Sequence, residues 1–145
     1  MINRLKLLPF LVSLLLGLHR SAADVGTATS YSPPYLPTAC YGGDASQFPS
    51  NNFFAAAGDG IWDNSAACGR LYLVKCLSST VPRACADGQP PILVKIVDHA
   101  SALVSPPSHG GATMVLSDAA FRAITNSSAG QITQINIDFT HSKKV

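Results

Sequence analysis

Short segments with an apolar face recur through the chain, and glycine, proline or serine separates one from the next. In the clearest of them apolar and polar side chains alternate, which is the period of a strand with one buried face. These strands and short apolar runs are residues 26–31, 53–57, 70–76, 91–98, 113–116 and 131–140. Many short strands joined by turn-rich loops favour a small β-barrel over a helical or doubly wound fold.

One segment, residues 119–125, has a helical pattern. Ser117 stands before it as an N-cap, and Asp118 lies in the first turn, where a negative charge favours the helix dipole. Asn126 and Gly130 follow as terminating residues. The expected fold class is therefore all-β with one short helix.

The first 23 residues have the pattern of a secretory signal peptide. Two basic residues precede an apolar stretch at residues 7–18, and Ser-Ala-Ala at residues 21–23 forms a cleavage site before Asp24. A membrane anchor is the alternative, but the stretch is short and contains Pro9. No later segment is apolar for long enough to span a bilayer, so we expect a soluble, secreted product with no membrane insertion after cleavage.

Removal of this segment changes the electrostatic character of the chain. Arg4, Lys6 and Arg20 leave with it, so the formal net charge moves from +2 to −1. For a nearly neutral domain, non-specific binding to nucleic acid or to anionic membranes loses its main electrostatic basis, and we expect neither partner. Residues 24–145 suit one domain with a single core.

Four cysteines lie in the mature part: Cys40, Cys68, Cys76 and Cys85. An even number in a secreted chain predicts two disulfides. A zinc site needs closely spaced pairs, whereas the spacings here are 28, 8 and 9 residues and no histidine is near. We expect no metal and no cofactor.

Six motifs occur in the order of a known family: "GTATSYSPPY", "ACYG", "DGIWDNSAACGR", "VKC", "VKIVDH" and "LSDAAFRAI". Each is weak alone, but together they resemble the plant EG45-like (expansin-like) domain proteins, which include the plant natriuretic peptides and blight-associated proteins. The resemblance covers nearly all of residues 24–145. It implies a six-stranded double-psi β-barrel, the fold of expansin domain 1 and of family 45 endoglucanases, secreted to the cell wall space (apoplast).

The resemblance has further implications for the architecture. It implies the pairings Cys40–Cys68 and Cys76–Cys85, and a barrel without the second, carbohydrate-binding domain of true expansins. The chain ends at Val145, five residues after the last expected strand, so we expect no second domain. We also expect a monomer. One family disulfide is missing, because Ala100 stands near its first cysteine and residues 101–111 contain none.

A second departure concerns catalysis. Related glycosidases have a proton-donating acid at the position of Val115, while Asp98 matches the other family aspartate. Glycoside hydrolysis needs two carboxyl groups, so we expect no enzymatic activity. Asp118, His99 and His109 are the remaining proton donors nearby, and we expect the helix-turn acid to face solvent and the histidines to be exposed and inert.

Several residues are candidates for binding. Thr27, Thr29 and Tyr31 match the groove-lining strand of the family, although threonine and tyrosine are also ordinary strand formers. Asp98 ends a strand whose alternate residues Ile92, Val94 and Ile96 form an apolar face, so it either lines a groove or accepts backbone N–H groups. Trp62 either stacks on a sugar ring or anchors its loop. Asn126-Ser127-Ser128 is a glycosylation sequon.

Three functions follow in order of preference. The first is a non-enzymatic, natriuretic peptide-type protein, acting on a cell-surface receptor in water and solute homeostasis or stress responses. The second is a wall polysaccharide-binding or wall-loosening module that uses Thr27, Tyr31, Asp98 and Trp62. The third, a hydrolase, lacks its second acid.

Overall fold

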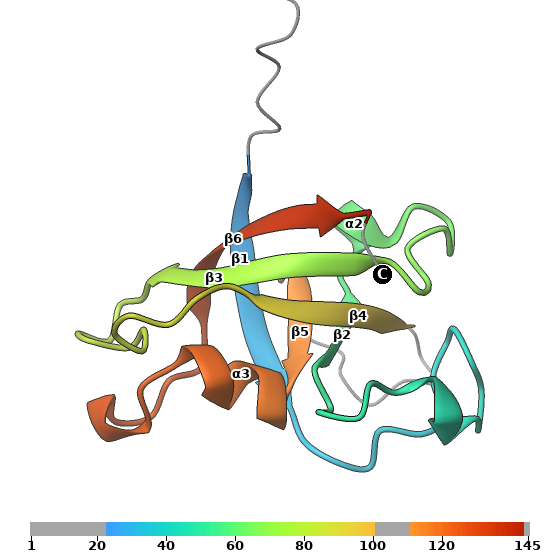
Figure 1. Ribbon diagram of the computed structural model, residues 1–145, viewed down its shortest axis with the longest axis horizontal. Helices are drawn as coiled ribbons and strands as arrows, with labels where there is room; N and C mark the ends of the chain where they lie inside the picture. The colour runs from blue at the N-terminus through green and yellow to red at the C-terminus, as the bar shows by residue number, and fades with distance from the viewer. Residues whose placement is uncertain (1–22, 101–110, 144–145) are drawn as a thin grey trace, which may run out of the picture.

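The computed structural model describes residues 23–100 and 111–143, and the six strands in these residues form a closed barrel (Figure 1). The strands are β1 (Asp24–Tyr31), β2 (Phe54–Ala57), β3 (Leu71–Ser78), β4 (Ile92–His99), β5 (Met114–Ser117) and β6 (Ile135–Ser142). Within the described residues the connections include two α-helices and two 3₁₀ helices: η1 (Ala45–Gln47), α2 (Asp59–Trp62), α3 (Asp118–Ile124) and η2 (Ser127–Ala129). The expected signal peptide lies, but for its last residue, outside the described residues.

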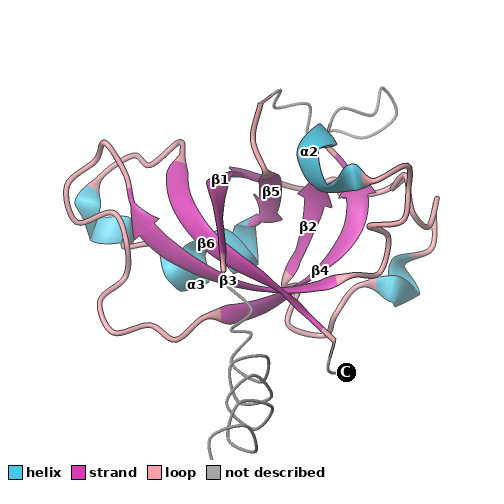
Figure 2. Ribbon diagram, turned by 90° about the horizontal axis from the view of Figure 1, so that it is seen from above, coloured by secondary structure: helices cyan, strands magenta, loops and turns pink. Residues whose placement is uncertain are grey.

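The strands follow one another around the barrel in the order β1-β5-β2-β4-β3-β6. The pairs β1/β5 and β2/β4 are parallel, and the other contacts are antiparallel. Every expected strand or apolar run is a strand, with bounds shifted by a few residues, so the expected fold class is confirmed. The turn-rich residues 59–62 instead form the single turn of α2. In Figure 2 the helices lie around the strands.

In strands with one solvated side, buried and exposed side chains alternate, and the buried ones form the inner face of the barrel. In β3, Tyr72, Val74 and Cys76 are buried while Leu73 is exposed, and the buried residues of β6 likewise alternate with polar ones. The buried side chains of both strands join the interior core cluster. Period-two patterning therefore groups the side chains of each face, and closure of the barrel makes one of the two faces the inner one.

The strands β2 and β5 are buried on both faces. Their residues are all buried and belong alternately to the interior core and to a second apolar cluster outside it, apart from the polar cap residue Ser117. This outer cluster consists of Tyr31, Phe54, Ala56, Val97, Ala100 and Val115, with Tyr35, Tyr41, Phe48 and Ala112 packed against it. Burial on both faces explains why these two strands are continuous apolar runs.

A β-bulge changes the face on which Asp98 lies. Ile96 pairs with Ala55, but the next residue of β2, Ala56, pairs with Asp98. The extra residue, Val97, breaks the alternation. The expectation that Asp98 shares a face with Ile96 is therefore wrong, because Asp98 is in register with the outer cluster and not with the interior.

Disulfides and a helix cap hold the connections. Cys40–Cys68 and Cys76–Cys85 are both bonded, each with a Cα–Cα distance of 5.5 Å, as the resemblance implied. Ser117 caps α3, because its hydroxyl accepts the Ala120 N–H at 3.2 Å, as the sequence predicted.

Candidate functional site

A row of four residues crosses four neighbouring strands of the barrel wall. Thr29 pairs with Val115, Val115 with Ala56, and Ala56 with Asp98. Residues in register across a sheet present their side chains to the same face. Two of the predicted groove residues, Thr29 and Asp98, are thus the polar ends of one row, and its middle is apolar.

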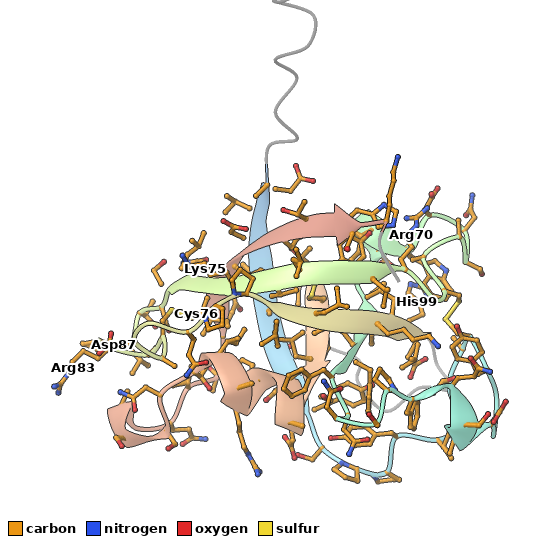
Figure 3. The ribbon with its side chains drawn as sticks, viewed as in Figure 1. Arg70, Lys75, Cys76, Arg83, Asp87 and His99 are labelled. Atoms are coloured by element: carbon orange, nitrogen blue, oxygen red, sulfur yellow. A yellow bond between two sulfur atoms is a disulfide. The ribbon has the colours of Figure 1, made fainter. Side chains whose placement is uncertain are left out.

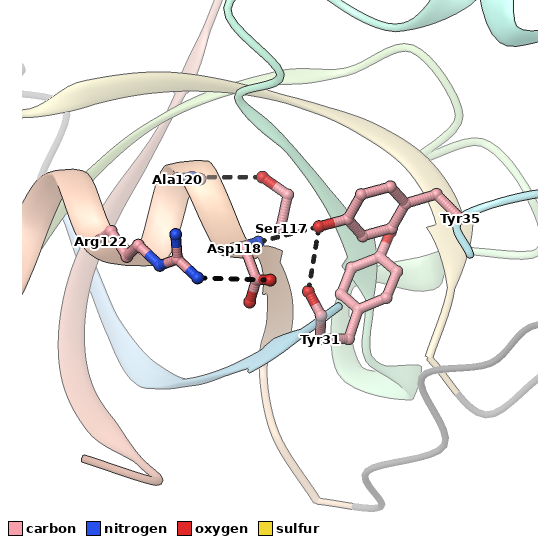
Figure 4. Close-up of polar contacts among 6 residues, drawn as sticks. All are labelled: Tyr31, Tyr35, Ser117, Asp118, Ala120 and Arg122. Carbon is pink, nitrogen blue, oxygen red and sulfur yellow. Dashed lines mark hydrogen bonds and ion pairs between the residues drawn. The ribbon is translucent and has the colours of Figure 1, made fainter. Parts of the chain in front are cut away.

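Val115, where the resemblance implies an acid, is fully buried in the outer apolar cluster. The next acid along the chain, Asp118, is engaged at the start of α3 (Figure 4). Its N–H donates to the Tyr35 hydroxyl at 3.2 Å, and its carboxylate lies 3.8 Å from the guanidinium of Arg122. The carboxylate of Asp118 is therefore only partly exposed and lies beside Arg122, whereas we expected it to face solvent.

Asp98 itself is completely buried near the end of β4. Its Oδ1 accepts the N–H of Ala39 at 2.7 Å and the N–H of His99 at 2.8 Å. The first of these bonds ties the loop that carries Cys40 to β4. Of the two roles expected for this acid, the structural one, acceptance of backbone N–H groups, is therefore present.

Tyr31 lies beside Asp98 in the same buried region. Burial, and next the negative charge of Asp98, raise the pKa of Tyr31 above its ordinary value. The Tyr31 ring packs edge-on against Tyr35 at 4.9 Å and Phe54 at 6.3 Å between ring centroids. Within residues 23–100 and 111–143, neither the Tyr31 hydroxyl nor the Thr29 hydroxyl has a hydrogen-bond partner.

Thr27 has a structural role in joining two strands. Its N–H donates to the Thr113 hydroxyl at 2.9 Å, and its carbonyl accepts the Thr113 N–H at 3.0 Å. These bonds bring the start of β5 against β1. Thr27 is partly buried and lies two residues before Thr29 on the strand.

Trp62 and His99 form a stacked pair that the sequence did not predict. Their ring centroids are 4.2 Å apart and the ring planes differ by 5°. The Nε2 of His99 lies 2.8 Å from Oδ1 of Asp59, and 18% of the His99 side chain is exposed. His99 is therefore a strand residue with partners, whereas we expected an exposed, inert loop histidine. His109 lies outside the described residues.

One face of the Trp62 indole is covered by this stacking, which favours the loop-anchoring role left open above. Trp62 remains partly exposed, so part of its ring is still available to a ligand. No local signal links Trp62 to His99, because they are 37 positions apart and meet only when α2 folds over the end of β4.

A surface depression of about 640 Å³ lies beside α2, lined among others by Asp59, Arg70, Tyr72 and His141. Arg70 donates to Asp63 at 2.7 Å, and this bond raises the pKa of Arg70. Arg70 and His99 lie at the same end of the molecule (Figure 3). Among the described residues, no group of three or more histidine, cysteine or acidic side chains is placed to hold a metal ion. No helix in the same part of the chain is long and apolar enough to cross a membrane.

The chain is similar to several curated plant proteins, although no family model matches it. An EG45-like domain containing protein of Citrus jambhiri is 41% identical over 114 residues, covering 76% of this chain and 77% of the relative. Putative EG45-like domain containing protein 1 of Arabidopsis thaliana is 39% identical over 121 residues, covering 82% and 84%. EG45-like domain containing protein 2 of the same plant is 36% identical over 112 residues, covering 76% of both chains.

Solved structures with a similar fold are bacterial expansins. Apo-expansin of Clavibacter michiganensis matches with a TM-score of 0.57 and 20% identity over 85% of this chain and 52% of the expansin. A point mutant of that expansin in complex with cellohexaose matches with a TM-score of 0.57 and 21% identity over 83% and 50%. The chain spans about half the length of these expansins, and at this identity the likeness concerns the fold.

Proposed function

The chain belongs to the EG45-like domain proteins of plants, and from this membership we propose that it is a secreted protein that acts without hydrolysing its target. Its proposed place of action is the apoplast. Its proposed role is that of the natriuretic peptide-type members, in water and solute homeostasis or stress responses. The observation that carries the non-hydrolytic part of the proposal is the burial of Val115, at the position where the resemblance implies the second carboxyl group of a glycosidase. The homeostasis role is proposed from the resemblance to the natriuretic peptide-type members.

Hydrolysis of a glycosidic bond needs one group to protonate the leaving oxygen and another to activate water or to attack. In the row Thr29–Val115–Ala56–Asp98 there is one carboxylate, and its Oδ1 already accepts two backbone N–H groups. This arrangement supports a structural or binding role for the region. It does not supply the pair of groups that the reaction requires.

The proposed partner is a cell-surface receptor, as for the natriuretic peptide-type members. Asp98 is fully buried and Tyr31 nearly so, which leaves the surrounding loops as the surface for such a contact. The proposal therefore places receptor contacts on the loops of the barrel and not on the row itself.

The test is the volume of plant protoplasts in iso-osmotic medium after addition of residues 24–145 with both disulfides formed. We expect a dose-dependent volume change. The matched control is the same protein reduced and alkylated, which has the same amino-acid sequence but carries four blocked cysteines and has lost both cross-links. No response to the folded protein, or an equal response to the alkylated one, would contradict the proposed role.

A second candidate function is binding of a wall polysaccharide without cleavage. The observation that favours it is the partly exposed Trp62–His99 stack, because a flat aromatic surface suits a sugar ring. A bacterial expansin of the same fold has been solved with cellohexaose, which gives the probe for the test. Trp62 is the one tryptophan of the chain, so its emission reports the site directly.

Titration with cellohexaose should then shift the Trp62 emission and release heat in calorimetry. Trp62→Phe, which keeps an aromatic ring, should weaken binding less than Trp62→Ala. Binding that is unchanged in Trp62→Ala would remove the stack from this candidate function.

A further inference from the structure

The sequon Asn126-Ser127-Ser128 lies directly after α3, where the chain turns into η2. Ser127 and Ser128 are exposed, and Asn126 is the N-cap of η2. The Oδ1 of Asn126 accepts the Ser128 N–H at 3.1 Å. The sequon is thus on the surface, with its acceptor side chain folded back into a local turn.

The amide nitrogen that would carry a sugar is bonded to a different part of the chain. Nδ2 of Asn126 donates to the carbonyl of Arg83 at 3.2 Å, and the backbone N–H of Asn126 donates to the carbonyl of Ala84 at 2.7 Å. Both acceptors belong to the loop between β3 and β4. In the folded protein this loop therefore holds the Asn126 side chain.

The disulfide Cys76–Cys85 closes that same loop. Cys85 itself forms an isolated β-bridge with Thr125, and the Ala86 N–H donates to the Ile124 carbonyl at 3.0 Å. The cross-link thus holds a short stretch of the loop against the chain that runs into the sequon. Figure 3 places Arg83 and Cys76 at the opposite end of the barrel from His99.

We propose that Asn126 is N-glycosylated and that the transfer occurs before the Cys76–Cys85 loop closes over it. In the transfer, Nδ2 displaces the diphosphate of a lipid-linked oligosaccharide. A bond forms from Nδ2 to C1 of the first sugar, the bond from C1 to the diphosphate oxygen breaks, and Nδ2 loses one of its two protons to a base of the transferase. The inference rests on the secretory route that is part of the proposed function.

The modified chain can still reach the same fold. A side-chain amide has two N–H donors, and the sugar replaces one of them. The remaining N–H suffices for the single bond to the Arg83 carbonyl. Arg83, which accepts the bond from Asn126, lies at the opposite end of the barrel from His99 (Figure 3). A glycan on Asn126 is therefore attached far from the Trp62–His99 stack and leaves it accessible.

The fraction of chains that carry the glycan depends on timing, because glycan transfer and closure of the Cys76–Cys85 loop both involve the Asn126 side chain. Chain synthesis proceeds at about 5–20 residues per second, whereas disulfide formation takes roughly seconds to hours. Chains whose loop closes early would escape modification. We therefore expect two populations of the secreted protein, with and without the glycan.

The first experiment expresses residues 24–145 behind a signal peptide of proven efficiency in eukaryotic secretory cells, so the chain's own leader plays no part. Intact mass before and after peptide-N-glycosidase treatment gives the occupancy. Ser128→Ala should abolish it, because the sequon is lost while the backbone bond to Asn126 stays. Ser127→Ala keeps the sequon and should match the wild type. Absence of glycan on the wild type would overturn the site.

The second experiment tests the order of events. Cys76→Ser/Cys85→Ser should raise occupancy above the wild type, and the matched double variant Cys40→Ser/Cys68→Ser should not, because its disulfide lies elsewhere. An equal rise in both variants would mean that slow folding in general sets the occupancy. Either that result or full occupancy of the wild type would overturn the proposed competition.

If a cysteine variant is retained in the cell, a cell-free reaction tests the same order of events. Purified Cys40→Ser/Cys68→Ser protein, whose one remaining disulfide is Cys76–Cys85, is offered oxidised or reduced to an oligosaccharyltransferase with its lipid-linked donor. We expect modification of the reduced chain alone. Equal modification of both forms would overturn the order, and modification of neither would overturn the site. A negative protoplast assay would leave these results unaffected.

Discussion

Asp98 of β4 and Val115 of β5 pair with the same residue, Ala56 of β2, from its two sides. Two strand spacings of about 4.8 Å each place their Cα atoms roughly 9.6 Å apart. Asp98 and Val115 therefore lie in one row across β4, β2 and β5, and Asp98 carries the one carboxyl group of that row.

We predict that the mature protein releases no reducing sugar from soluble β-glucan. A general acid contributes about 10²–10⁴-fold to such reactions, and none stands at the position of Val115. The measurement is a reducing-sugar assay with Asp98→Asn beside the wild type. Release that disappears in Asp98→Asn would contradict the prediction and show that another group supplies the proton.

Val115→Asp should strongly destabilise the protein. The residue is fully buried in the outer apolar cluster, so the substitution buries a carboxyl group among apolar side chains with no opposite charge to pair with it. We expect a loss of about 3–5 kcal/mol in the free energy of unfolding near pH 7, the cost of an uncompensated buried charge. Burial raises the folded pKa of such a carboxyl above its unfolded value of about 3.9.

The sign of the pH dependence follows from that shift. Below the unfolded pKa the group is neutral in both states, and as pH rises only the unfolded state ionises readily, so the variant loses stability relative to wild type. Urea unfolding of Val115→Asp, Val115→Thr and wild type at pH 4 and pH 7 measures this. Equal losses for the aspartate variant at the two pH values would show that its carboxyl reaches water.

The two disulfides should differ in their contribution to stability. They enclose sequence separations of 28 and 9 residues, for which the chain-entropy relation gives about 3.5 and about 2.5 kcal/mol. Urea unfolding of the two cysteine-to-serine double variants tests the difference. A larger loss for the Cys76–Cys85 variant would mean that contacts of its loop, and not chain entropy, dominate.

Tyr31→Phe should be neutral or stabilising at pH 7, by up to about 1 kcal/mol, because it removes a buried hydroxyl that has no hydrogen-bond partner within residues 23–100 and 111–143. The folded pKa of Tyr31 is raised by burial and by Asp98. The stability associated with the neutral phenol is therefore fully present below the unfolded pKa of about 10 and is lost as pH rises above it.

Unfolding free energies of wild type and Tyr31→Phe at pH 8 and pH 10.5 check this relation. The wild type should lose more stability over the interval than the variant does. Parallel losses would indicate that the Tyr31 phenol ionises as easily in the folded state as in the unfolded state.

The sequence by itself determined the local features of this protein. Alternation grouped Tyr72, Val74 and Cys76 on one face of β3, and the serine before the helical pattern marked the N-cap of α3. These features depend on neighbours two to four residues apart, so periodicity and capping preferences reveal them. The valine at position 115, where the resemblance implies an acid, was also visible without coordinates.

The tertiary structure alone decided how distant segments meet. The bulge at Val97 places Asp98 in the outer row instead of on the predicted interior face. The helix α2 stacks Trp62 on His99. The loop closed by Cys76–Cys85 accepts a hydrogen bond from Asn126. Each depends on strand register or on contacts between segments far apart in the chain. A one-residue shift in register reverses every following side chain, and no local pattern records where the shift occurs.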